Sequence, residues 1–154
     1  TKKDGTPVKP EDIEAVDQTL DLWTGILISN FKVEGVPVKV ITSSSQEQDA
    51  IGVSVESALL NTGQLKIRLR FPAPTARWSD YGTQWNNPKY YNSTLTTNYD
   101  NTAVINRSLD SLSYTVGLKW EGEAKVMEKK QHYFSIAPKG EKIALTCTFS
   151  DYPL

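Results

Sequence analysis

The sequence predicts an all-β protein, built as a large two-sheet antiparallel β-sandwich, and runs of alternating apolar and polar residues carry this prediction. Every odd position from Leu65 to Phe71 is apolar, and every even position carries a cation. Successive side chains of a strand point to opposite faces, so such a run buries one face and leaves the other in water. Ile51–Val55 and Leu112–Trp120 alternate in the same way. About nine or ten strands with short connections are typical of a sandwich.

The chain divides into a connector, a sandwich and the start of a linker. Residues 1–16 are polar and contain two prolines, which is typical of a connector with at most a short helix. Residues 17–150 hold the alternating runs and form the predicted sandwich domain. A long aromatic loop at 72–91 interrupts it, and residues 151–154 are expected to begin a linker to a further domain.

Glycines and prolines mark the places where we expect the strands to bend or end. Gly25 lies inside an otherwise strand-like stretch and predicts a bulge or a bend, while Trp23 is expected in the core. Trp120–Glu123 and Pro138–Gly140 are interpreted as turns between separate strands. The inter-sheet core is predicted to contain Leu69, Phe71, Val53, Val55, Val116, Leu118, Leu145 and Cys147.

Composition and charge argue against several classes of function. The formal net charge of −1 gives no reason to expect nucleic acid or an anionic membrane as a partner. No apolar run approaches the roughly 20 residues that span a bilayer. The single cysteine, Cys147, cannot form an intrachain disulfide, and with one histidine, His132, no zinc-like spacing arises. We therefore expect no metal and no cofactor.

The loop at 72–91 holds two of the 4 tryptophans and three of the 7 tyrosines. Irregular loops longer than about 12–15 residues are usually functional or disordered, and disordered segments are poor in aromatics. The loop is therefore predicted to be ordered and to face a partner, either a sugar or a neighbouring protein surface. Packing within its own domain and a mobile loop stay open as alternatives. The candidate contact residues are Trp78, Asp80, Tyr81, Trp85, Asn86, Tyr90 and Tyr91.

Two charged features of the sequence invite a chemical interpretation. Asp80 lies between aromatic residues that would raise its pKa, but a glycosidase needs a second carboxylate, and this loop offers no evident partner. We therefore expect no catalytic residue in this chain. Lys66, Arg68 and Arg70 form a cationic stripe that would suit a phosphate or an acidic glycan. The alternative is a solvated strand face, or one opposite acidic residues of a neighbouring strand.

Several stretches resemble the amino-terminal β-sandwich domain of glycoside hydrolases of the six-hairpin, (α/α)6-barrel type, related to family 65. The resemblance lies in Asp21–Gly25, Phe31, Gly35–Val38, Gln48–Ile51, Glu56–Leu60 and Arg68–Pro72. It implies a supersandwich fold like that of galactose mutarotase. It also implies an accessory, non-catalytic role beside the (α/α)6-barrel catalytic domain of the same chain.

The resemblance further implies a parent glycoside hydrolase (EC 3.2.1.-) and a secreted or periplasmic location. The first residues, Thr1–Gly5, lack the apolar core of a secretory signal. A carbohydrate-binding module that uses the loop at 78–91 to bind an oligosaccharide, and a structural sandwich without a sugar role, stay open as alternatives.

Overall fold

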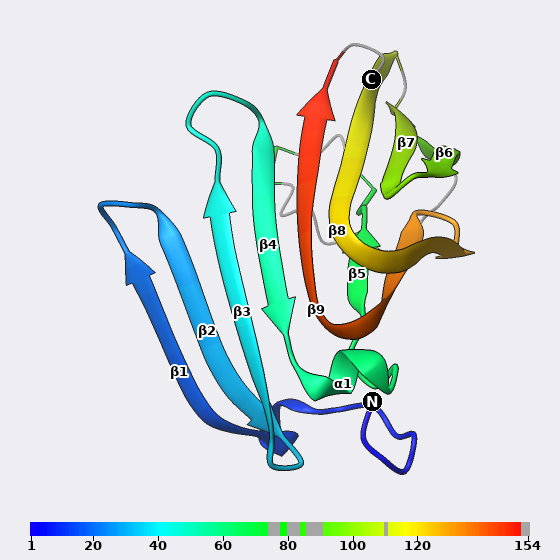
Figure 1. The fold of residues 1–154 in the computed structure, drawn as a ribbon. Coiled ribbons are helices and arrows are strands. Elements are labelled where there is room, and N and C mark those ends of the chain that lie inside the picture. The colour runs from blue at the N-terminus through cyan, green and yellow to red at the C-terminus, as the bar shows by residue number, and fades with distance from the viewer. Residues whose placement is uncertain (74–77, 80–83, 86–90, 110, 152–154) are drawn as a thin grey trace.

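The computed structural model describes residues 1–73, 78–79, 84–85, 91–109 and 111–151. These residues form an all-β, antiparallel protein, as the alternating runs predict, with one 3-10 turn, η1 (Pro10–Asp12), and one short helix, α1 (Ala58–Asn61) (Figure 1). Its strands are β1 (Ile13–Asp21), β2 (Ile26–Val33), β3 (Val36–Ser44), β4 (Ala50–Glu56), β5 (Ile67–Arg70), β6 (Tyr91–Tyr99), β7 (Thr102–Leu109), β8 (Leu112–Lys130) and β9 (Tyr133–Ser150). β1 begins inside the segment 1–16, which the sequence suggests is a connector.

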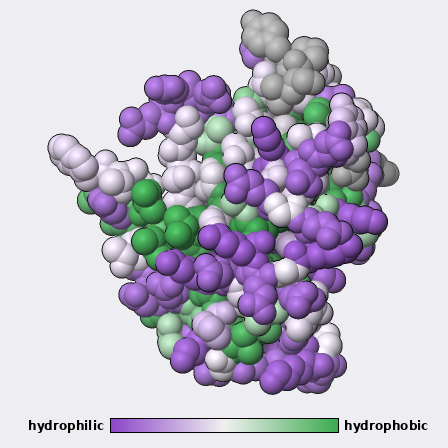
Figure 2. Space-filling model, in the orientation of Figure 1, coloured by the Kyte–Doolittle hydropathy of each residue, from purple (hydrophilic) through white to green (hydrophobic). Residues whose placement is uncertain are grey.

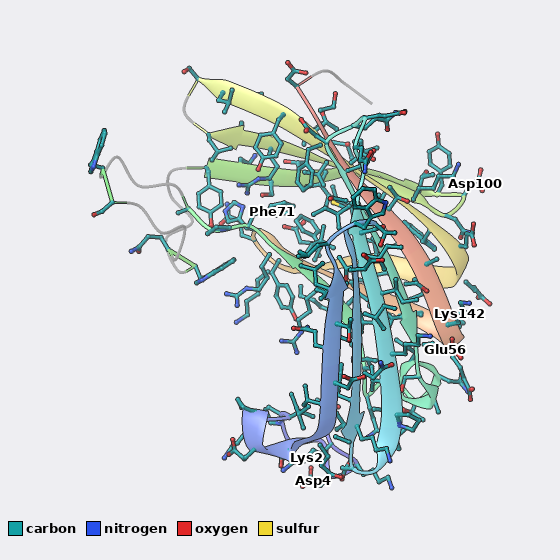
Figure 3. All side chains as sticks on the ribbon, turned by 90° about the vertical axis from the view of Figure 1, so that its left-hand side faces the viewer. Lys2, Asp4, Glu56, Phe71, Asp100 and Lys142 are labelled. Atoms are coloured by element: carbon teal, nitrogen blue, oxygen red, sulfur yellow. The ribbon has the colours of Figure 1, made fainter. Side chains whose placement is uncertain are left out.

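One sheet connects all the strands of the described residues. The strand order is β1-β2-β3-β4-β9-β8-β7-β6, and β5 pairs with β9 beside this path. Two meanders, β1–β4 and β6–β8, are thus joined by the last strand of the chain, which lies between them (Figure 1). Glu56 of β4 pairs with Lys142 of β9, and both are labelled side by side in Figure 3.

The two layers arise because the long strands β8 and β9 bend. Their pairing continues across the bend, with a register shift between Glu121 and Glu123, and Figure 1 shows both strands turning to the same side, β9 below β8. Gly122 and Gly140 take positive φ angles of 92° and 101° there, which residues with a Cβ rarely adopt. The expected turns at Trp120–Glu123 and Pro138–Gly140 are therefore wrong. These residues form a bulged bend, because β8 and β9 stay paired with each other on both sides of it.

The core lies between the two layers. Phe134 and Ile136 of the folded-over part of β9 are fully buried, and Ile105 and Val116 are fully buried on the meander β6–β8. The predicted core is confirmed: four of its members are buried, and the other four are partly buried and pack against them. The buried members are Val55, Val116, Leu118 and Leu145, and the partly buried ones are Val53, Leu69, Phe71 and Cys147.

The hairpin of β1 and β2 departs from the sequence prediction. The strands pair as far as Asp21 and Ile26, and Gly25 closes the turn at φ 68°, donating its N–H to the Asp21 carbonyl at 2.8 Å. Trp23 lies at the tip of this turn and is 94% exposed. The expected bulge at Gly25 and the expected burial of Trp23 are therefore wrong. The stretch contains two strands instead of one, and the turn between them is exposed.

Candidate site at the base of the aromatic loop

The loop that follows β5 is fixed at both ends to the β-core. Phe71 donates its N–H to the His132 carbonyl at 3.1 Å, and Ala73 donates its N–H to the Gln84 carbonyl at 2.7 Å. At the other end the Tyr91 hydroxyl donates to the Phe71 carbonyl at 3.0 Å. Figure 3 shows Phe71 next to β6 and β7. The two ends of the loop therefore meet, because Tyr91 at its end contacts Phe71 at its start.

A buried cluster of polar and aromatic side chains lies under this closure. The Ser93 hydroxyl is 2.7 Å from His132 Nδ1, and Arg107 Nη1 donates to the same hydroxyl at 2.8 Å. Because the guanidinium can only donate, the Ser93 oxygen accepts from Arg107, and the same hydroxyl shares a hydrogen bond with His132 Nδ1. The Tyr91 ring stacks on His132, with centroids 3.7 Å apart. The cluster joins β6, β7 and the β8–β9 turn.

Aromatic rings and hydroxyl groups surround the guanidinium of Arg107 in the interior. Its side chain is buried with only 3% exposure, and its Nε donates to the Tyr114 hydroxyl at 3.0 Å. The guanidinium carbon lies 4.4 Å from the centroid of Phe71 and 5.0 Å from that of Tyr91. Burial raises the pKa of Tyr91, and the charges of Arg107 and Arg70 act in the opposite direction. Cation–π contacts thus supply part of the stabilisation that a counter-ion would give to this buried charge.

The cluster contains a serine–histidine pair, but its burial points to a structural role. Ser93 and His132 are both buried beneath Tyr91, so a substrate could not approach the serine oxygen. His132 also takes a positive φ of 64° in the turn between β8 and β9. We interpret the cluster as the anchor that holds the ends of the loop together.

The candidate contact residues on the loop differ in where they lie. Trp78 is fully exposed, and Trp85 is 44% exposed with the guanidinium carbon of Arg70 at 4.8 Å from its ring centroid. Tyr91 is buried and belongs to β6. Asp80, Tyr81, Asn86 and Tyr90 lie outside the described residues. The role of these seven residues in contacts stays a prediction.

Ser93, Arg107 and His132 are not among the residues singled out from the sequence. His132 stands out only as the single histidine of the chain. Ser93 and Arg107 occupy ordinary positions of alternating strands, and their partners are 39 and 14 positions away. Their meeting depends on strand pairing, so no local pattern marks it.

Two kinds of site are absent from the residues that the structure describes. In that part of the chain, no three or more His, Cys, Asp or Glu side chains gather closely enough to hold a metal ion. In the same ranges, no helix has the length and apolar character needed to cross a membrane.

Comparison with known proteins gives a structural match. No protein-family model matches the sequence, and no curated protein matches it either. A solved structure named "Putative kojibiose phosphorylase from human microbiome" matches with a TM-score of 0.49 and 15% sequence identity. The match covers 89% of this chain and 19% of that chain, so this chain spans about a fifth of its length. The match is a likeness in fold alone.

Proposed function

We propose that this chain is a non-catalytic, amino-terminal accessory domain of a carbohydrate-active enzyme and that it packs on the catalytic domain of the same protein. One observation carries the proposal: the aromatic loop is anchored in the core at both ends, while Trp78 and Trp85 face outward. Exposed aromatic side chains gain most when a second surface covers them, so Trp78 and Trp85 are well placed to bind a partner.

Other exposed apolar side chains support a role beside a larger partner. Leu22 and Trp23 are exposed at the β1–β2 tip. Ile28 and Ile41 pair across β2 and β3 and are half-buried, and Figure 2 shows hydrophobic side chains gathered over this part of the sheet. Extended apolar surfaces on a monomer usually mark an interaction site. The sequence resemblance supplies the partner, a helical (α/α)6 barrel whose active-site rim this domain would shape.

The parent enzyme is proposed to act on glycosidic bonds. The resemblance suggests a glycoside hydrolase, and the name of the matched structure adds glycoside phosphorolysis as a second reaction of this class. Either reaction would take place on the catalytic domain, and the resemblance again suggests a secreted or periplasmic protein. We expect this chain alone to release no product from aryl glycosides or oligosaccharides. Turnover that is abolished by Asp80→Asn would contradict the proposal.

Hydrogen exchange tests the packing role. The amides of residues 78–91 are expected to exchange more slowly in the full-length protein than in the isolated chain, because docking on the catalytic domain excludes water. The buried strand β7 serves as the internal control and should be protected in both. Strong and equal protection of residues 78–91 in both proteins would show that the loop packs within its own domain.

A carbohydrate-binding module is the second candidate, and the full exposure of Trp78 favours it. An exposed indole ring offers a flat apolar surface on which a sugar ring can stack. Binding would quench tryptophan fluorescence of the isolated chain, and Trp78→Ala should remove the quenching. Trp23→Ala is the matched control, because Trp23 is also almost fully exposed but lies on the β1–β2 tip. Quenching that survives Trp78→Ala would exclude this loop as the sugar site.

A further inference from the structure

Two neighbouring hollows beside β5 are lined by cationic side chains. One has a volume of about 440 Å³ and the other about 290 Å³. Arg68 and Tyr133 line both hollows, so the two adjoin, and we call them together the basic groove. The cations of the basic groove are Lys66, Arg68, Arg70, Lys129 and Lys130.

No carboxylate neutralises these charges within the described residues. Among the residues that the structure describes, no aspartate or glutamate lines either hollow. β5 pairs with Tyr133–Ile136 of β9, a segment without acidic residues, so the expected alternative of opposed acidic side chains on the neighbouring strand is wrong. The ion pairs between described residues involve other lysines, namely Lys2, Lys9 and Lys139. The basic groove is therefore a local positive field on a chain of formal charge −1.

Aromatic rings hold the two arginines of the basic groove. The guanidinium carbon of Arg70 lies 4.8 Å from the centroid of Trp85, and that of Arg68 lies 6.0 Å from the centroid of Tyr133. A cation–π contact does not use up the N–H donors of a guanidinium. Two parallel N–H donors fit the two oxygens of a carboxylate or a sulfate.

The spacing of the cations favours an extended ligand. Lys66 directly precedes β5, and Arg68 and Arg70 are alternate residues of β5, so the Cα atoms of the two arginines lie about 6.6 Å apart and their side chains share one face of the strand. A single small anion would use one of these positions only. The larger hollow also has an apolar wall that includes Phe31 and Leu65, with Gln64 as a hydrogen-bonding group. A chain of sugar rings has apolar faces, hydroxyls and, in acidic glycans, charges at regular intervals.

We propose that the basic groove binds an acidic oligosaccharide, whose carboxylate or sulfate groups pair with Arg68 and Arg70 of β5 and with the neighbouring lysines of the groove. The choice of a saccharide rests on the proposed function, whereas the choice of an extended anion rests on the groove itself. Single-stranded nucleic acid is less suited, because binding its bases requires a row of free aromatic faces. Here the Trp85 ring already makes a cation–π contact with Arg70, so that contact competes with the stacking of a base.

Isothermal titration of the chain tests this proposal. The ligands are a hexamer of galacturonate, a sulfated hexasaccharide, neutral maltohexaose and a single-stranded DNA hexamer. We expect either or both of the acidic saccharides to bind with an affinity that falls as salt is raised, and maltohexaose and DNA to bind much more weakly. DNA binding as tight as that of the acidic saccharides would overturn the proposal in favour of a general polyanion surface. Absence of saccharide binding at low salt would overturn it outright.

Variants locate the binding. Arg68→Gln with Arg70→Gln should weaken binding of the acidic saccharide by about tenfold or more, because charge-assisted hydrogen bonds are lost. Lys32→Gln with Lys39→Gln removes the same charge from exposed positions on β2 and β3 and should have a small effect. Arg68→Lys keeps the positive charge but removes the guanidinium group, and it disturbs the fold little. It therefore tests whether binding needs the paired N–H donors as well as the charge. If the double arginine variant and the double lysine variant weakened binding equally, the saccharide would bind outside the basic groove. This outcome does not depend on the hydrogen-exchange result for residues 78–91, which tests the proposed function separately.

Discussion

At the scale of single residues, Ser93 satisfies two buried polar groups at once, the Arg107 guanidinium and the His132 ring. Ser93→Ala should lower the free energy of unfolding by about 1–3 kcal/mol, because both partners lose a hydrogen bond in a site closed to water. Urea denaturation of the variant measures this loss. Ser113→Ala on β8 is the control, since Ser113 is exposed, and should stay within about 0.5 kcal/mol. Equal effects of the two changes would contradict the buried cluster.

The thiol of Cys147 gives a second prediction at this scale. Cys147 packs against the core, and burial raises its pKa to about 11. At pH 8 about one thiol in a thousand is then ionised, so iodoacetamide should alkylate the native chain slowly. Unfolding in urea should accelerate the reaction roughly a hundredfold, as the pKa returns to its ordinary range. Mass spectrometry follows the reaction, and equal rates in both states would show that the thiol is open to solvent.

At the scale of elements, the bend of β8 and β9 depends on backbone conformations that favour glycine. A Cβ at Gly140 would meet nothing within 4 Å, so Gly140→Ala has no steric clash and its cost comes from the φ of 101°. We expect a loss of about 1–3 kcal/mol in the free energy of unfolding. Gly52→Ala is the control on β4. Gly52 lacks a positive φ, and its added Cβ would lie in ordinary contact with Ser43 Oγ at 3.4 Å. If both variants were equally stable, the bend would not depend on Gly140.

The β1–β2 tip should respond to acid. The carboxylate of Asp21 accepts from the side chain of Thr24 and from the amides of Trp23 and Thr24, which holds its pKa below the ordinary value of 3.8. The stabilisation of the turn by the ionised Asp21 carboxylate is therefore complete above about pH 3.8. It is lost as the pH falls through the lower pKa that this carboxyl group has in the folded state. The NMR shift of the Trp23 amide should follow this titration, and Asp21→Asn should abolish it. A midpoint above 3.8 would contradict the hydrogen-bonded turn.

The alternation of apolar residues predicted which faces of the strands are buried, because that pattern is local. Val116 and Leu118 lie inward as expected, and Lys66 lies outward. The pattern could not show whether a glycine ends a strand or bends it. Gly25 closes a hairpin, whereas Gly122 lies in a bend, and the difference depends on whether a partner strand continues beside it. The burial of Ser93 depends on pairings distant in sequence for the same reason.

At the scale of the whole molecule, Phe134 links the two layers. It is fully buried, and its ring meets Phe71 edge to face at a centroid distance of 6.2 Å. Phe134→Ala should cost about 3–5 kcal/mol of unfolding free energy. Leu69→Ala is expected to cost less, because Leu69 is only partly buried in the core. Chemical denaturation compares the two, and a larger loss for Leu69→Ala would mean that the layers meet mainly through β5.

The place of β9 between β4 and β8 has a consequence for how the protein is made. β4 ends at Glu56, and the segment that pairs with it begins at Lys142, close to the end of the 154 residues. On a ribosome, the first four strands must therefore wait with the edge of β4 open until the segment from Lys142 onward has emerged. Open strand edges recruit other strands, so a nascent or prematurely terminated chain should be the form most prone to aggregation.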